Sequence, residues 1–340
     1  MVTRYEDYDL SAQNTFRMKV RCACYVEYDD AKDLPGLDFD SLPKPFLHIG
    51  AGSNLLFTGD FPGTVFHSKV KFVKYVDMGL DELLVTVGAG VVFDDLVAEL
   101  CRHGLWGAEN LSLIPGEVGA AAVQNIGAYG AEVKDIIAGV VCFDLQTRSK
   151  TAFKVGECGY GYRSSIFKRP ENKGRYIVTS VLLRVSRKYA PNLSYKGVRA
   201  ALGDRDPQTS QEVRDAVIRL RRDKLPDPAE LGSAGSFFKN PVLAPEDFAR
   251  VERIAREDGV VPHFVLEDGT VKVPAAWLID RCGLKGRRVG GAAVYEKQPL
   301  VIVNASAEAS PQDILALESE IVSAVKAKFG VELSPEVEHI

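Results

Sequence analysis

The chain has 340 residues, which is more than one hydrophobic core usually serves, so we expect two or three packed units. Hydrophobic residues make up 46% and charged residues 26% of the sequence, a balance that excludes an intrinsically disordered chain. The formal net charge of -4, with no dense basic run, argues against nucleic acid as a partner. The sequence contains no run of about 18 apolar residues, so it predicts no membrane-spanning segment.

The first strand is expected over residues 18–28, where apolar and polar residues alternate and place Cys22 and Cys24 on one face. A second strand, over residues 83–87, leads into a helix whose apolar positions run from Val92 to Leu100 and which stops at Gly104. Further strands are expected over residues 140–145 and 176–185.

A change in composition after Ser186 predicts a boundary between units. Residues 187–207 hold two prolines and Tyr195 and are expected to form a connecting loop. The second unit then opens with a capping box, Thr209 to Glu212, and a helix that ends before Pro226. Beyond it the sequence predicts helices after Pro245 and Pro274, a strand over residues 300–304, and a helix between Ser310 and Gly330.

The six cysteines and five histidines lack the spacings of metal sites, so we expect no bound metal. The cysteines are expected to be small core residues of a protein in a reducing compartment. The first residues lack the apolar run of a secretory signal, and the protein is therefore predicted to be cytoplasmic.

Three glycine-rich segments are candidates for binding phosphate groups, because small residues let backbone N–H groups converge on an anion. They cover residues 48–56, 114–130 and 232–241. Each is weak evidence alone, since G-x-G without a third glycine is also common in ordinary turns.

The order of several motifs resembles one family. The chain carries G-x-G-S-N, I-P-G-x-x-G with Q-N-I-G-A-Y-G, Y-R-x-S-x-F-K, K-L-P-D-P, G-S-F-F-K-N-P and a terminal P-E-V. In this order they resemble the UDP-N-acetylenolpyruvoylglucosamine reductases, the flavoenzymes that complete UDP-N-acetylmuramate in peptidoglycan synthesis. The loop with Tyr195 resembles that of the long-loop members, in which a loop tyrosine covers the substrate.

The resemblance implies an α+β fold. It implies a two-subdomain FAD-binding unit of the vanillyl-alcohol-oxidase (PCMH) type in residues 1–186 and a substrate loop in residues 187–211. A smaller α+β substrate-binding domain would cover residues 212–329, and residues 330–340 would return to the active site. It also implies that NADPH reduces FAD, and that hydride then passes to the methylene carbon of UDP-N-acetylglucosamine enolpyruvate. We expect a monomer.

The resemblance also assigns roles to individual residues. Arg163 and Glu336 would polarise the substrate carboxylate, and Ser236 would donate the proton. The substrate's UDP moiety would contact Tyr195, Lys224, Asn240 and Gln298. The FAD-binding residues would be Gly50, Ala51, Gly52, Ser53, Asn54, Ile114, Pro115, Gly116, Gly119, Gln124, Asn125, Gly127, Ala128 and Tyr129.

Each catalytic residue has an alternative role that the sequence leaves open. Arg163 could pair with Glu157 on the surface, Ser236 could cap a turn, and Glu336 could be a mobile carboxylate near the chain end. Lys224 could be a solvated charge at a helix end.

Two other functions fit the glycine-rich segments. One is an FAD-dependent alcohol or sugar-lactone oxidase of the same flavin fold, and the other is a non-catalytic protein that binds a nucleotide sugar. The C-terminal stretch departs from the family pattern at Ser334 and Glu338, which alters the charge beside Glu336.

Overall fold

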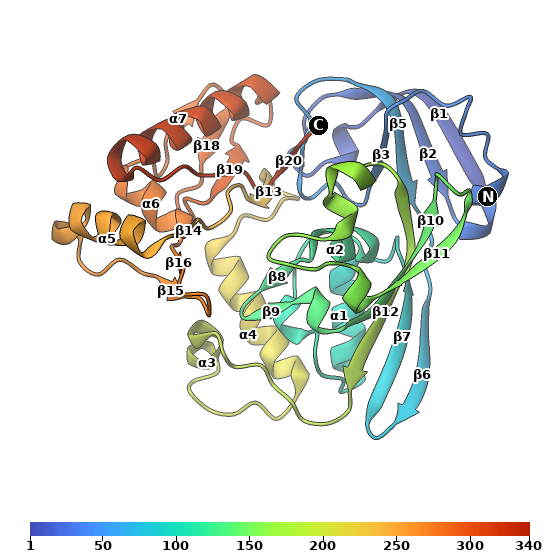
Figure 1. Ribbon diagram of the computed structural model, residues 1–340, viewed down its shortest axis with the longest axis horizontal. Coiled ribbons are helices and arrows are strands. Elements are labelled where there is room, and N and C mark those ends of the chain that lie inside the picture. The colour runs from blue at the N-terminus through green and yellow to red at the C-terminus, as the bar shows by residue number, and fades with distance from the viewer. The chain divides into compact units, whose positions relative to one another are not determined.

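The chain divides into two units that are each assembled from separate stretches of sequence. The computed structural model describes residues 1–340 apart from the side chain of Asp258 (Figure 1). Unit 1 comprises Met1–Tyr8, Cys22–Ala51 and Phe61–Asp223. Unit 2 comprises Asp9–Arg21, Gly52–Asp60 and Lys224–Ile340. The backbone therefore passes repeatedly from one unit to the other before its C-terminal third.

A five-stranded antiparallel sheet carries the largest core of unit 1. Helices α1 and α2 lie on one face of this sheet (Figure 1), where alternate residues of β7 such as Val85 and Val87 are fully buried. The predicted strand over residues 83–87 and the helix that follows it are confirmed by β7 and α1. In sheet order the strands are β11 (Ser149–Lys154), β10 (Ile137–Asp144), β12 (Tyr176–Ser186), β7 (Glu82–Gly88) and β6 (Val73–Gly79), and the helices are α1 (Phe93–Arg102) and α2 (Val118–Gln124).

A second sheet of unit 1 positions the first glycine-rich segment. Strand β5 lies parallel to both β2 and β3, and β3 ends directly before Gly50. The strands in sheet order are β1 (Val2–Asp9), β2 (Arg21–Tyr28), β5 (Phe61–Ser68) and β3 (Phe46–Ile49).

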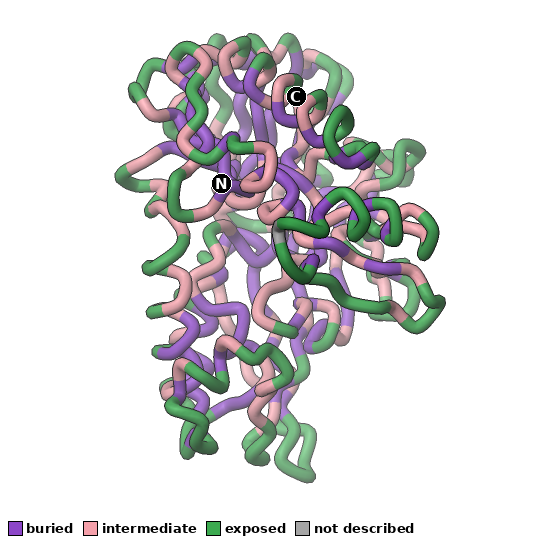
Figure 2. The backbone as a smooth tube through the Cα atoms, turned by 90° about the vertical axis from the view of Figure 1, so that its left-hand side faces the viewer, coloured by how far each residue is buried: buried purple, intermediate pink, exposed green. Residues whose placement is uncertain are grey.

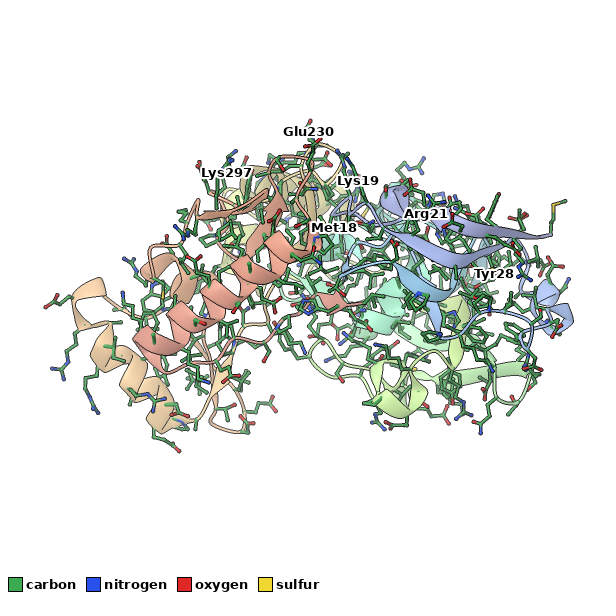
Figure 3. All side chains as sticks on the ribbon, turned by 90° about the horizontal axis from the view of Figure 1, so that it is seen from above. Met18, Lys19, Arg21, Tyr28, Glu230 and Lys297 are labelled. Carbon is green, nitrogen blue, oxygen red and sulfur yellow. The ribbon has the colours of Figure 1, made fainter. Side chains whose placement is uncertain are left out.

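The strand predicted over residues 18–28 begins later, at Arg21. The side chain of Asn14 accepts from Met18 N and donates to Met18 O, so local hydrogen bonds occupy this backbone before the strand starts. The predicted alternation of side chains is nevertheless present: Met18 is buried, whereas Lys19 and Arg21 are exposed (all three are labelled in Figure 3).

The connecting segment after β12 contains a short helix before the predicted long one. Glu212 N donates to Thr209 Oγ1, so the predicted capping serves the start of α4. Both helices pack their apolar sides against Trp106 in unit 1. They are α3 (Lys196–Ala201) and α4 (Ser210–Lys224).

Unit 2 is a four-stranded sheet with helix α7 packed against β17 and β18 (Figure 1). Helix α7 has both ends predicted from the sequence: Ser310 and Asp313 form a capping box, and Gly330 closes the helix with a φ of 69°. The elements are β13 (Gly232–Ser236), β19 (Val301–Asn304), β18 (Ala292–Val294), β17 (Arg288–Val289), α5 (Pro245–Ile254), α6 (Ala275–Arg281) and α7 (Pro311–Phe329).

Smaller pairings complete the two units. A three-stranded sheet in unit 2 has the order β14 (Val242–Leu243), β16 (Val271–Lys272), β15 (Phe264–Val265). Two-stranded pairs join β4 (Leu55–Leu56) to β20 (Glu338–His339), and β8 (Gly127–Ala128) to β9 (Ala131–Glu132).

Figure 2 shows that buried stretches of the chain lie inside and exposed stretches at the surface. All six cysteines are free thiols, and all but Cys282 are buried. Among the residues described, no helix combines the length and hydrophobicity needed to cross a membrane.

Candidate functional site

The first glycine-rich loop, residues 50–54, is a close-packed turn between β3 and β4. Gly52 has a φ of 62°, and a methyl group at this position would lie 2.1 Å from Gln13 O. Only glycine fits there, because a side chain would be strained and would also collide with backbone. At Gly50 a methyl group would lie 3.1 Å from Ala120 Cβ, so in unit 1 the first and second loops abut.

The second loop, residues 114–130, and the residue before it include several positions with left-handed backbone. Leu113, Gly116, Asn125, Tyr129 and Gly130 all have positive φ. Its start is fixed to the segment before α1, since Val118 N donates to Val91 O and Gly119 N to Ala89 O. Small residues allow this close approach.

Asn125 is the centre of the second loop and is fully buried. Its Nδ2 donates to Gly161 O at 2.8 Å and to Glu132 Oε2 at 3.0 Å, and its Oδ1 accepts from Lys134 N. The neighbouring Gln124 accepts from Lys168 Nζ at 2.6 Å. Both side chains therefore hold the shape of the loop.

The side chain of Arg163 packs against the second loop and is only partly exposed. Its guanidinium donates to Gly127 O at 2.8 Å and to Asn125 O at 3.4 Å. Ser165 Oγ donates to Val123 O in the same loop. Together with the hydrogen bond from Lys168 to Gln124, these contacts explain the Y-R-x-S-x-F-K motif. Its polar side chains hold residues 162–168 against the second loop.

Tyr195 of the connecting loop contacts the end of the second loop. Its ring meets that of Tyr129 edge to face, with centroids 5.2 Å apart. Asn110 Nδ2 donates to Tyr129 O and to Asn192 O, and Asn192 Nδ2 donates to Gly130 O. A candidate cofactor segment and a candidate substrate segment are thus joined within unit 1.

Two residues beside Tyr129 were not expected from the sequence. The Nε atom of Arg221 is buried without a hydrogen-bond partner among the described residues, and the same holds for Asn110 Oδ1. Burial lowers the pKa of Arg221 and raises that of Tyr129, and the two side chains interact electrostatically. A buried guanidinium N–H without an acceptor suits an anionic ligand. The sequence signal was an arginine one helical turn before Lys224, which resembles a solvated helix end.

Within unit 2 the structure brings together Ser236, Glu336 and Asn54. Ser236 ends β13 opposite Val301, and the next residue, Phe237, accepts from Glu336 N at 2.8 Å. Asn54 Nδ2 donates to Glu336 O at 3.2 Å, and Asn54 O accepts from Glu338 N. The segment around Glu336 is therefore an ordered edge of the unit.

Asn240, Gln298 and Lys224, the other candidate substrate residues, lie in three different elements or turns. Asn240 Oδ1 accepts from Ala275 N at the start of α6. Gln298 lies in the turn between β18 and β19, where its carbonyl accepts from Val301 N. Lys224 is the last residue of α4 and is exposed. Gln298 is thus near the strand pair that carries Ser236, whereas Arg163 and Tyr195 belong to unit 1.

Comparison with known proteins identifies the family. Residues 227–340 match the model described as UDP-N-acetylenolpyruvoylglucosamine reductase, C-terminal domain, and residues 40–147 match an FAD binding domain. A UDP-N-acetylenolpyruvoylglucosamine reductase of Bacteroides fragilis is 46% identical over 98% of this chain and 99% of its own length. The chain belongs to the UDP-N-acetylenolpyruvoylglucosamine reductase family.

Two further relatives agree with the family membership. The reductase of Porphyromonas gingivalis is 43% identical over 98% of both chains. The crystal structure of the Thermus caldophilus reductase covers 100% of this chain and 98% of its own, with a TM-score of 0.68 and 26% identity. The resemblance and the α+β fold with an FAD-binding domain are confirmed, and the chain is an oxidoreductase of peptidoglycan synthesis.

The residues of unit 1 fit FAD as a cofactor of this family. Gly50 and the glycines of the second loop permit close approach to a pyrophosphate, and Arg221 has a buried N–H without an acceptor among the described residues. Among the described residues, no group of three or more His, Cys, Asp or Glu side chains could hold a metal ion.

Proposed function

We propose that this protein reduces UDP-N-acetylglucosamine enolpyruvate to UDP-N-acetylmuramate, with NADPH as the reductant and FAD as the flavin. The observation that carries the proposal is the backbone hydrogen bond from Glu336 N to Phe237 O, 2.8 Å long. It holds a glutamate near the chain end beside the strand that ends at Ser236, although chain ends are usually poorly ordered. The backbone pairing thus places the two residues proposed to polarise the carboxylate and to donate the proton on adjoining segments of unit 2.

FAD is proposed to lie on the two glycine-rich loops of residues 50–54 and 114–130, and Arg221 is an additional donor for a phosphate group. When bound, FAD would accept hydride from NADPH and donate it to the enolpyruvyl methylene carbon. The loops' contribution is positional, because hydrogen bonds within the protein fix their backbone. Asn125 and Gln124 would act through the shape of the loop.

Arg163, Glu336 and Ser236 are proposed to act on the substrate. Hydride arrival at the methylene carbon leaves negative charge on the neighbouring carbon and its carboxylate. Arg163 stabilises this charge as a cation, and Glu336 orients and polarises the carboxylate. Ser236 Oγ then gives its proton to the neighbouring carbon, which completes the lactyl ether.

Substrate recognition is proposed for Tyr195, Lys224, Asn240 and Gln298. Lys224 supplies a mobile cation for the diphosphate, while Asn240 can offer its amide Nδ2 because its Oδ1 is already engaged at α6. For these roles we propose a cofactor domain of residues 1–186, a substrate loop of residues 187–211, a substrate domain of residues 212–329 and a tail of residues 330–340. The proposal includes a cytoplasmic monomer.

Stopped-flow absorbance of the flavin tests the function in two half-reactions. NADPH alone should bleach the oxidised flavin band. Anaerobic addition of UDP-N-acetylglucosamine enolpyruvate should then restore it, with one UDP-N-acetylmuramate formed per flavin. A flavin that NADPH does not bleach, or that the enolpyruvyl substrate does not reoxidise, refutes the proposal. Reduction by an alcohol or sugar lactone instead would indicate an oxidase.

A further inference from the structure

A buried chain of hydrogen bonds runs through unit 1 from strand β2 to the second glycine-rich loop. Tyr25 Oη lies 2.7 Å from His67 Nδ1, and His67 Nε2 lies 2.9 Å from Glu117 Oε1. Tyr25 is 0% exposed, His67 4% and Glu117 8%. None of the three has a role in the proposed reaction, although Glu117 lies inside the I-P-G-x-x-G motif.

His67 and Glu117 connect the bases of the two loops. His67 on β5 is the register partner of Ile49, the residue directly before Gly50. Glu117 belongs to the second loop, and a methyl group on Gly50 would lie 3.2 Å from Glu117 Oε2. The hydrogen bond between His67 and Glu117 therefore fixes the second loop against the first.

The position of Glu117 creates an electrostatic problem for a bound anion. A buried carboxylate against the first loop repels a pyrophosphate there, and the repulsion is strong where water is excluded. A positive charge on His67 would neutralise the carboxylate.

The hydrogen bonds around His67 can be satisfied in both of its charge states. In the neutral ring, Nε2–H donates to Glu117 and Nδ1 accepts from the Tyr25 hydroxyl. In the protonated ring, Nδ1–H donates to Tyr25 Oη, and the Tyr25 hydroxyl turns to Glu27 Oε1, 3.3 Å away. Burial and the nearby Glu27 carboxylate raise the pKa of Tyr25, which keeps its own proton in both states.

The charged groups that face His67 come from three elements. Glu27 on β2 lies 3.8 Å from His67 Nδ1, and Lys69, just after β5, lies 3.0 Å from Glu27. Glu117 faces the other side of the ring from the second loop. Because Lys69 balances Glu27, Glu117 is the carboxylate whose charge remains for His67 to balance.

We propose that His67 and Glu117 form a latch that holds the two loops together and takes up a proton when the pyrophosphate of FAD binds. The latch rests on the proposed function, because it requires FAD to lie on these loops. The proton comes from solvent and ends on His67 Nδ1, while Tyr25 transfers its hydrogen bond to Glu27. Both residues are positioning residues and touch no reacting atom.

Calorimetric titration of the apoprotein with FAD tests the proton uptake. Titrations at neutral pH in two buffers of different ionisation enthalpy give the number of protons taken up for each FAD bound. We expect uptake by the wild-type protein. We expect none by His67→Gln, whose amide keeps a donor toward Glu117 but cannot become charged, and none by Glu117→Gln. Equal uptake by wild type and His67→Gln overturns the proposal.

FAD affinity tests whether the His67–Glu117 hydrogen bond holds the two loops together. Glu117→Ala should weaken FAD binding by about tenfold or more, because it removes the acceptor for His67 and the contact with Gly50. Glu117→Gln should restore binding to within about threefold of wild type, since it keeps an acceptor. Glu99→Gln is the matched control, because Glu99 accepts from Tyr75 on other elements of unit 1. Binding by Glu117→Ala that equals wild type contradicts the latch.

The outcomes separate the latch from the function on which it rests. A wild-type apoprotein that binds no FAD refutes the proposed function. A wild-type protein that binds FAD, with variants that match it in proton uptake and affinity, refutes the latch alone. Circular dichroism of the apoproteins checks folding, and if Glu117→Ala is unfolded, the proton uptake of the two glutamine variants decides.

Discussion

Several motif residues have a backbone conformation that their side chains alone would not favour. Asn125, Tyr129 and Arg163 have φ values of 46°, 51° and 52°. For a residue other than glycine, this conformation costs about 1 kcal/mol or more. Asn125 and Arg163 offset the cost with the partly buried hydrogen bonds that join the second loop to the segment around Arg163. Part of the motif is therefore explained by the loop's own stability.

Ser236→Ala separates a chemical role of the serine from a structural one. The variant should leave flavin reduction by NADPH within about twofold of wild type. It should slow flavin reoxidation by the enolpyruvyl substrate by about 10²–10⁴-fold, because only this half-reaction needs the proton. Stopped-flow absorbance measures both rates on the same sample.

Ser334→Ala is the matched control for Ser236→Ala. Ser334 is exposed, and its backbone carbonyl, which the substitution leaves in place, accepts from Lys239 N. This variant should match wild type in both half-reactions. Equal slowing of both half-reactions in Ser236→Ala would show that the hydroxyl maintains the local structure of β13 instead of supplying the proton.

At the scale of elements, one ion pair joins α1, α4 and the start of the second loop. Asp94 accepts from Arg214 Nη1 and Nη2 and from Leu113 N. Burial acts to raise the pKa of Asp94, but the hydrogen bonds from Arg214 and Leu113 lower it below its ordinary value of 3.8. The ionised carboxylate therefore stabilises the fold at pH values above the ordinary pKa of 3.8. Its contribution to the free energy of unfolding is lost as the pH falls through the lower pKa of the folded state.

Asp94→Asn should reveal this contribution. We expect the free energy of unfolding near pH 7 to fall by about 1–3 kcal/mol, because Arg214 loses a charged partner in a partly buried position. We also expect a weaker decline of stability below pH 3.8 than in wild type. Urea unfolding at several pH values measures both effects. An identical pH dependence in wild type and variant would contradict a stabilising role for the Asp94 carboxylate.

Elements with local end signals were predictable from the sequence. Helix α7 has its capping box, first-turn proline and closing glycine within its own residues, and α5 starts directly at Pro245. The start of β2 was predicted too early, because Asn14 binds the backbone of Met18 from outside the alternating pattern. Local patterns carry no information on such a partner.

The candidate site was predictable only where a motif carried it. The resemblance indicated Arg163, Ser236 and Glu336. The structure adds the side-chain hydrogen bonds of Arg163 to the second loop and the backbone pairings of Ser236 and Glu336. Glu117 and His67 were missed, because they lie 50 residues apart and each resembles an ordinary core or loop residue. Their pairing depends on the register of β5 with β3, which the sequence does not specify.

At the scale of the whole molecule, unit 2 depends on segments from the N-terminal part of the chain. Phe16, Leu55 and Leu56 are buried, and Phe16 packs against Phe237. Backbone bonds add to this: Ser233 N donates to Thr15 O. Residues 9–21 and 52–60 thus contribute core side chains and backbone hydrogen bonds to unit 2, which residues 224–340 otherwise form.

A fragment of residues 224–340 should therefore not fold alone. Each large apolar side chain that it lacks would contribute about 1.5–3 kcal/mol. Together they match much of the net stability of a typical domain, about 5–15 kcal/mol. We expect poorly dispersed amide NMR signals and no cooperative thermal transition. The same fragment co-expressed with residues 1–223, which supply both missing segments, should fold and give dispersed signals. Dispersed signals and cooperative melting of the fragment alone would show that residues 9–21 and 52–60 are dispensable for this unit.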